Sequence, residues 1–195
     1  FGLMGFAMKL KRKYENFSAV LLSGSMAILY FITYAAFDFY DLIPQELAFA
    51  LMVLFTAFTV LAAINYNRQI IAHIGLVGAY AVPFLLSDDS GRVGVFFSYV
   101  TIVNIGILVI GFLRYWKPLY YVSFGLTWLI FLVWSAAGYD EEKHFTLAFS
   151  FSAIFYFIFY VNNLSYKLVK REKFVFADVL MLTLNSFIFF GVGYY

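Results

Sequence analysis

The sequence predicts an all-α fold, a polytopic bundle of about seven transmembrane helices joined by short loops. Of its 195 residues, 64% are hydrophobic, 23% aromatic and only 12% charged, whereas soluble domains are about half apolar and about a quarter charged. Apolar runs of roughly 18–22 residues recur along the chain, long enough to cross about 30 Å of hydrocarbon. These runs are apolar all round, which argues against a soluble bundle. The alternating ten-residue segments typical of a β-barrel do not occur in the sequence.

The elements follow one another with short polar turns between them. Residues 1–8 are expected to be the tail of a preceding helix, and residues 9–13 a basic loop. The predicted spans are 16–37, 46–66, 70–87, 93–113, 119–138, 145–166 and 175–195. Pro118 suits a helix start, where its missing N–H leaves no bond unmade. We expect residues 1–195 to form a single transmembrane block of a longer membrane protein.

The third span is short and carries both glycine and proline. Gly75 and Gly78 remove side-chain bulk, so that another helix can approach closely. Pro83 removes a backbone donor and crowds the carbonyl of Ala79, which predicts a kink. The acidic turn at residues 87–91 then reverses the chain.

The basic residues are segregated between alternate turns. Only Arg92 and Lys143, of the 13 Lys and Arg residues, fall on one side, and that side is otherwise acidic. Short loops rich in Lys and Arg stay in the cytoplasm. The sequence therefore predicts a multi-pass protein of the bacterial cytoplasmic (inner) membrane, with the basic loops 9–13 and 167–173 in the cytoplasm.

Three stretches carry a resemblance to a known family. They are G-L-V-G-A-Y-A-V-P-F-L-L-S from Gly75, F-S-Y-V-T-I-V-N-I-G-I-L-V-I from Phe97, and R-Y-W-K-P-L from Arg114. They resemble a family of uncharacterised polytopic bacterial inner-membrane proteins, catalogued as domain of unknown function 2339. The resemblance covers most of the chain and implies a long membrane protein with further helices. It implies no activity, cofactor or catalytic residue.

Polar side chains near the membrane midplane are the first candidate site residues. Asn104 and Asn185 lie far from the ends of their spans, and Ser23, Ser25 and Thr127 fall at similar depth. One interpretation is interhelical hydrogen bonding. The other is a neutral polar lining for a solute that crosses the membrane.

A second polar layer lies closer to the predicted cytoplasmic side. His73 and Asp178 are each five residues from a basic residue that ends a loop, Arg68 and Lys173 respectively. A His–Asp pair at this depth would suit a proton site. The alternative is that each is separately hydrogen-bonded or reaches water among the headgroups.

Several kinds of chemistry find no support in the sequence. There is no cysteine, and the two histidines fall on opposite sides, so we expect no metal site and no cofactor. Neither a phosphate-binding glycine loop nor a serine nucleophile elbow occurs, and we assign no catalytic residue. The expected partners are membrane lipids and further helices of the same longer polypeptide or of other membrane subunits, with no nucleic acid.

Three function classes remain open at this point. Transport of a neutral or lipid-like solute comes first, because interrupted helices often line transport sites. A non-catalytic membrane scaffold or assembly subunit comes second, and a membrane enzyme acting on lipid or glycan carriers third. A water-accessible path past Asn104 and Asn185 would favour transport, and a dry interior the scaffold. A cavity at the headgroups beside His73 would favour the enzyme.

Overall fold

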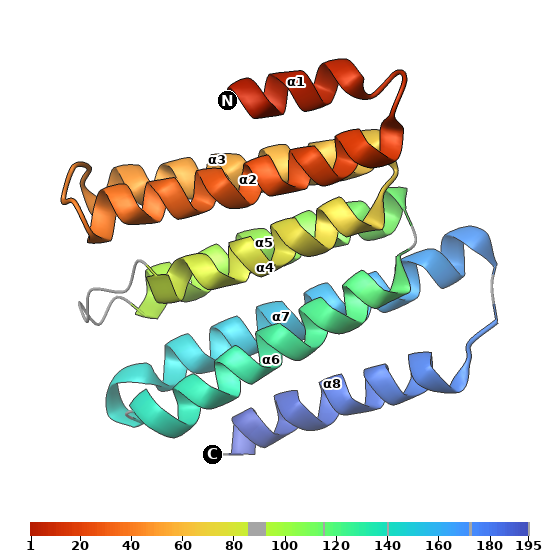
Figure 1. Ribbon diagram of the computed structural model, residues 1–195. Helices are drawn as coiled ribbons and strands as arrows, with labels where there is room; N and C mark the ends of the chain where they lie inside the picture. The colour runs from red at the N-terminus through yellow and green to blue at the C-terminus, as the bar shows by residue number, and fades with distance from the viewer. Residues whose placement is uncertain (86–92, 115, 140, 172, 195) are drawn as a thin grey trace. The chain divides into compact units, whose positions relative to one another are not determined.

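The protein is all-helical, as the sequence predicts. The computed structural model describes residues 1–85, 93–114, 116–139, 141–171 and 173–194, but not the side chains of 82–85, 141, 142, 166 and 168–170. The described residues form eight α-helices and no strand (Figure 1). They divide into two compact units, Phe1–Arg92 and Val93–Tyr195.

The first unit contains four helices packed around α2. Its helices are α1 (Gly2–Leu10), α2 (Glu15–Asp38), α3 (Gln45–Tyr66) and α4 (Gln69–Leu85). Helix α2 contacts the other three, and α3 also packs against α4. Because the turns between α2, α3 and α4 are short, consecutive helices run antiparallel (Figure 1).

The second unit contains four helices packed around α7. Its helices are α5 (Val93–Leu113), α6 (Lys117–Gly138), α7 (Glu141–Lys170) and α8 (Phe176–Tyr194). Helix α7 contacts α5, α6 and α8, and α5 also contacts α6. The core is aromatic: the buried ring of Phe97 lies 5.4 Å from Phe131, 5.0 Å from Trp134 and 6.0 Å from Phe155, centroid to centroid.

Among the described residues, six helices are long and apolar enough to cross a membrane. They are α2, α3, α5, α6, α7 and α8, and each matches a span predicted from the sequence to within a few residues at either end. Helix α4 has 17 residues, or about 26 Å of rise, at the short end of the spanning range. It covers most of the predicted span 70–87, whereas residues 86 and 87 and the acidic turn 87–91 lie outside the described residues.

Two helix ends follow directly from their residues. Helix α3 stops at Tyr66 because Asn67 takes a left-handed conformation (φ 50°), and its N–H bonds the carbonyls of Ala63 and Ile64. Pro118 lies in the first turn of α6, as the sequence predicts.

The two basic segments are more helical than predicted. Residues 9 and 10 belong to α1, and residues 167–170 belong to α7, so neither 9–13 nor 167–173 is wholly a loop. Helix α7 has 30 residues, about 45 Å of rise, which exceeds the hydrocarbon thickness and carries its end beyond the predicted span. The prediction treated charge as the mark of a loop, whereas a lysine with a buried partner continues the helix.

Candidate functional site

The two midplane asparagines both lie inside the second unit. Asn104 on α5 and Asn185 on α8 are each only 1% exposed. The Oδ1 of Asn104 accepts a hydrogen bond from the Thr127 hydroxyl on α6, at 3.1 Å. The Oδ1 of Asn185 accepts one from Trp128 Nε1 at 3.1 Å, and its Nδ2 donates to the Tyr156 carbonyl at 3.0 Å. Asn185 therefore connects α8 to α6 and to α7.

The two midplane serines are buried in the first unit. Ser23 and Ser25 are 1% and 4% exposed. Each hydroxyl donates to a carbonyl one turn back in α2, Ser23 to Ala19 at 2.9 Å and Ser25 to Leu21 at 2.7 Å. Such bonds satisfy a serine within its own helix.

The glycines of α4 face neighbouring helices of the first unit. A Cβ on Gly78 would lie 3.1 Å from the ring of Tyr30 on α2, and one on Gly75 would meet the methyl group of Thr59 on α3. Only glycine leaves room for these contacts without a shift of the neighbour. Pro83 is within α4, but its side chain lies outside the described set, and the kink stays a prediction.

His73 and Asp178 each have a partner of their own. The Nδ1 of His73 lies 2.9 Å from the Gln69 carbonyl, one turn back in α4. The Asp178 carboxylate lies 2.6 Å from the Lys167 ammonium, and both side chains are almost fully buried. The structure thus supplies separate partners for the two residues that the sequence raised as a possible proton site.

Asp178 also organises the start of α8. Its Oδ2 accepts the Val175 N–H at 2.9 Å, which caps the first turn of the helix. The Lys167 ammonium in turn donates to the Lys173 carbonyl at 2.9 Å. The backbone carbonyl of Asp178 accepts from Asn163 Nδ2 at 3.2 Å. These bonds join the end of α7 to the beginning of α8.

A small cavity lies beside this junction, between the end of α5 and the start of α6. It measures about 20 Å³, room for a water or two, and it opens outward. Its lining comes from all four helices of the unit and the turn before α6: Ile107, Ile110, Gly111, Arg114, Trp116, Lys117, Leu119, Tyr120, Tyr121, Asn162, Asn163 and Asp178.

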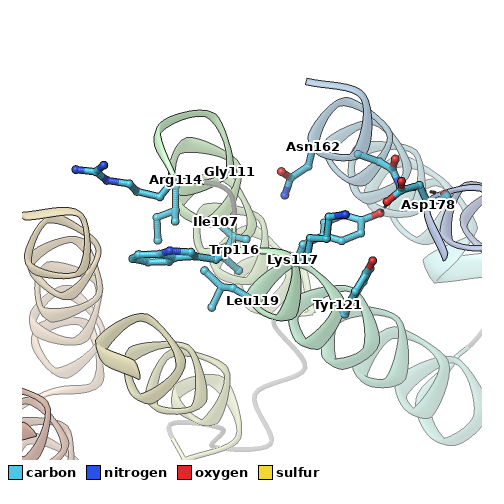
Figure 2. A pocket seen from close by; sticks show the side chains of 12 residues that line it. Ile107, Gly111, Arg114, Trp116, Lys117, Leu119, Tyr121, Asn162 and Asp178 are labelled. Carbon is cyan, nitrogen blue, oxygen red and sulfur yellow. Dashed lines mark hydrogen bonds between the residues drawn. The ribbon is translucent and has the colours of Figure 1, made fainter. Parts of the chain in front are cut away.

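The cavity lining places cationic and aromatic side chains around a buried amide (Figure 2). Figure 2 shows Arg114 and Trp116 on one side and Lys117, Tyr121 and Asp178 on the other, with Asn162 between them. The guanidinium of Arg114 extends away from the other lining residues, toward the outside. Arg114 is exposed, whereas Lys117 is half-buried.

Two amide atoms in the lining are buried without a partner. Asn162 and Asn163 are each 7% exposed. Asn162 Nδ2, a donor, and Asn163 Oδ1, an acceptor, have no hydrogen-bond partner among the residues that the structure describes. The oxygen of Asn162 lies against Gly111, where an added Cβ would collide with it. Buried polar atoms are nearly always paired, so this pair marks the cavity as the candidate site.

The described part of the chain holds no cluster of three or more His, Cys, Asp or Glu side chains. The expectation of no metal site and no cofactor stays a prediction.

The sequence analysis passed over most of the cavity. It did not group Lys117 with Asn162 and Asn163, because α6 and α7 place them far apart in the sequence. One signal was available for the ion pair: Lys167 and Asp178 flank a short turn between two antiparallel helices. Opposite charges at facing helix ends of such a hairpin are expected to meet.

The comparisons with known proteins agree with the membrane fold. A family model described as "Predicted membrane protein (DUF2339)" matches residues 1–192. The search of curated proteins and the search of solved structures found no match.

Proposed function

Because the chain belongs to the DUF2339 family of predicted membrane proteins, we propose that it acts as a non-catalytic membrane scaffold. In this role its helices hold lipids and neighbouring membrane segments in place. The proposed partners are further helices of a longer polypeptide or other membrane subunits. The proposed setting is the bacterial cytoplasmic membrane with the basic helix ends in the cytoplasm, which the segregation of Lys and Arg supports.

One observation carries the proposal: the midplane asparagines hold helices together. The carboxamide of Asn185 bonds α6 and α7 at once, and that of Asn104 bonds Thr127 on α6. Both asparagines are 1% exposed. An amide that lined a solute path would leave its polar atoms toward that path, since a passing solute must exchange bonds with them.

The glycines of α4 support the same role. The space beside Gly75 is occupied by Thr59, and the space beside Gly78 by the ring of Tyr30. The sequence analysis placed transport first because glycine and proline interrupt this helix. Close contacts at both glycines favour helix packing instead, and we therefore rank the scaffold above transport. The enzyme class stays third, since no described observation favours it.

The test uses the absence of native cysteine. Thr127→Cys places a single thiol beside Asn104, at a position that is 0% exposed. If the protein is a scaffold with a dry interior, a small water-soluble maleimide should not react with this thiol in membranes until the protein is unfolded. Lys173→Cys, at an exposed position between α7 and α8, is the positive control.

Rapid labelling of Thr127→Cys in the folded protein would mean that water reaches the midplane. That result would contradict the scaffold role and favour transport of a solute along a path past Asn104.

A further inference from the structure

The cavity at the start of α6 has the features of a headgroup site. We propose that it admits one hydroxyl of an anionic phospholipid headgroup, between Asn162 and Asn163, while the phosphate of that headgroup stays outside the cavity beside Lys117. The ligand chemistry is a phosphate ester that also carries a free hydroxyl. This assigns a specific lipid site, which a scaffold that only packs helices does not need.

The unpaired amide atoms define the hydroxyl part of the ligand. Asn162 Nδ2 offers a hydrogen and Asn163 Oδ1 offers a lone pair, and neither has a partner among the described residues. A hydroxyl satisfies both at once, because it accepts one hydrogen bond and donates another. A bare phosphate oxygen would satisfy only the Asn162 donor.

The orientation of the Asn162 amide is set by its surroundings. Its oxygen lies against Gly111, and its nitrogen points toward the middle of the lining residues (Figure 2). Asn163 is held from the other side, because its Nδ2 donates to the Tyr120 hydroxyl at 3.3 Å and to the Asp178 carbonyl at 3.2 Å. Both amides are thus fixed before a ligand arrives.

The charges around the cavity favour an anion. Lys117 lies in the first turn of α6, and Arg114 precedes it at the rim. Pro118 has no N–H, and the N–H groups of Leu119 and Tyr120 donate to the Trp116 carbonyl. The attraction for an anion therefore comes from the side chains of Lys117 and Arg114 rather than from the backbone of this helix end. The carboxylate in the lining, Asp178, lies 2.6 Å from the Lys167 ammonium and also interacts electrostatically with Lys117, so positive side chains outnumber the negative one around the cavity.

The position of the cavity favours a lipid as the source of this chemistry. It lies at the ends of two candidate membrane spans, α5 and α6, where headgroups reside. Trp116 and Tyr121 border it, and such aromatics are typical of the membrane interface. Its lining also includes the apolar side chains of Ile107, Ile110 and Leu119. Basic pockets between membrane helices bind anionic headgroups. A soluble phosphate ester with a hydroxyl would satisfy the same polar groups.

The experiment measures lipid binding to the intact protein in neutral detergent, by native mass spectrometry with thermal unfolding as a second readout. The probes are phosphatidylglycerol, which has phosphate and free hydroxyls; phosphatidylmethanol, which is anionic without a hydroxyl or any other donor in its headgroup; and phosphatidylcholine, which is neutral overall. We expect phosphatidylglycerol to bind roughly threefold to tenfold more tightly than phosphatidylmethanol, the effect of one or two hydrogen bonds. Phosphatidylcholine should bind most weakly.

Matched variants assign the binding to this cavity. Lys117→Gln should weaken binding of both anionic lipids, whereas Lys173→Gln, at an exposed basic position of the same unit, should not. Asn162→Leu should remove the preference for phosphatidylglycerol without lowering the stability of the lipid-free protein, because it deletes an unpaired buried donor. A purely structural role for Asn162 would instead lower that stability.

A glycine pair provides a second, independent variant. Gly111→Ala pushes on Asn162 and should weaken phosphatidylglycerol binding, whereas Gly125→Ala on α6 meets nothing within 4 Å and should not. Equal binding of phosphatidylglycerol and phosphatidylmethanol would overturn the proposal and leave only water in the cavity. Binding that is unchanged by Lys117→Gln and Gly111→Ala would overturn it as well. If glycerol phosphate competes at the same concentration as the lipid, the site stands and its ligand is the soluble ester.

Discussion

Tyr30 shows how one side chain holds three helices of the first unit together. It belongs to α2, its ring lies against Gly78 of α4, and its hydroxyl lies 2.7 Å from that of Thr56 on α3. The Thr56 hydroxyl also donates to the Met52 carbonyl of its own helix at 2.9 Å. Interhelical contacts of this kind, with a small residue opposite a large one, stabilise helix packing within a bilayer.

The close contact at Gly78 leads to the first prediction. Gly78→Leu should lower the free energy of unfolding by about 1–3 kcal/mol, because the new side chain must displace the Tyr30 ring. Thermal unfolding in detergent measures the change. The matched control is Gly24→Leu on α2, which meets nothing within 4 Å and should be neutral or slightly stabilising. Equal stability of the two variants would show that Gly78 does not pack against α2.

At the scale of elements, α7 and α8 form a hairpin joined by charge and by backbone bonds. Lys167 reaches the Asp178 carboxylate and the Lys173 carbonyl, while Asn163 reaches the Asp178 carbonyl. The pair is almost fully buried, so each charge depends on the other for its compensation. The hairpin also carries Asn162 and Asn163 into the cavity wall, which makes it the support of the proposed headgroup site.

The buried ion pair leads to a prediction about this hairpin. Lys167→Met leaves the Asp178 carboxylate buried without its cation, and should lower the free energy of unfolding by about 3–5 kcal/mol. Chemical or thermal unfolding of the purified protein gives the value.

The double variant is the control for this prediction. Lys167→Met with Asp178→Asn removes both charges but keeps an oxygen that can cap Val175. It should recover most of the lost stability, since no buried charge remains unpaired. A double variant as unstable as the single one would show that the charges do not act as a pair.

At the scale of the whole molecule, the distribution of charge bears on its orientation in the membrane. Of the 13 Lys and Arg residues, only Arg92 and Lys143 fall on the side predicted to be outside. Each predicted span corresponds to one helix, and the orientation of the chain stays a prediction.

Single cysteines test the orientation in a chain that has none of its own. Thiols at Leu42→Cys and Glu141→Cys should react with an impermeant reagent added to intact cells. Thiols at Lys13→Cys and Lys173→Cys should react only after the membrane is made permeable. Labelling of all four from the same side would contradict the alternating arrangement of the spans.

Most of the fold could be predicted from the sequence, because the length of an apolar run determines where a membrane helix begins and ends. Every predicted span overlaps one helix to within a few residues, except at the ends of α7. The division into two compact units was not foreseen, since contacts between helices depend on side-chain shape rather than on apolar length.

The candidate site was harder to predict than the fold. Asn104, Asn185 and Thr127 were identified from their depth, and Thr127 does bond Asn104. The partners of Asn185, Trp128 and the Tyr156 carbonyl, were not predicted. The cavity was not predicted from the sequence because its lining residues come from four different helices. Asn162 and Asn163 stand out only when their unpaired atoms are known.

The buried ion pair has a consequence for how the protein enters the membrane. Lys167 follows the predicted span 145–166, in the part of α7 that extends past the hydrocarbon, so its charge does not have to enter lipid with that helix. Lys167 gains its counter-charge only when Asp178 has been synthesised and lies 2.6 Å away. We therefore expect the end of α7 to stay hydrated during synthesis and to become buried against α8 only after α8 has followed it.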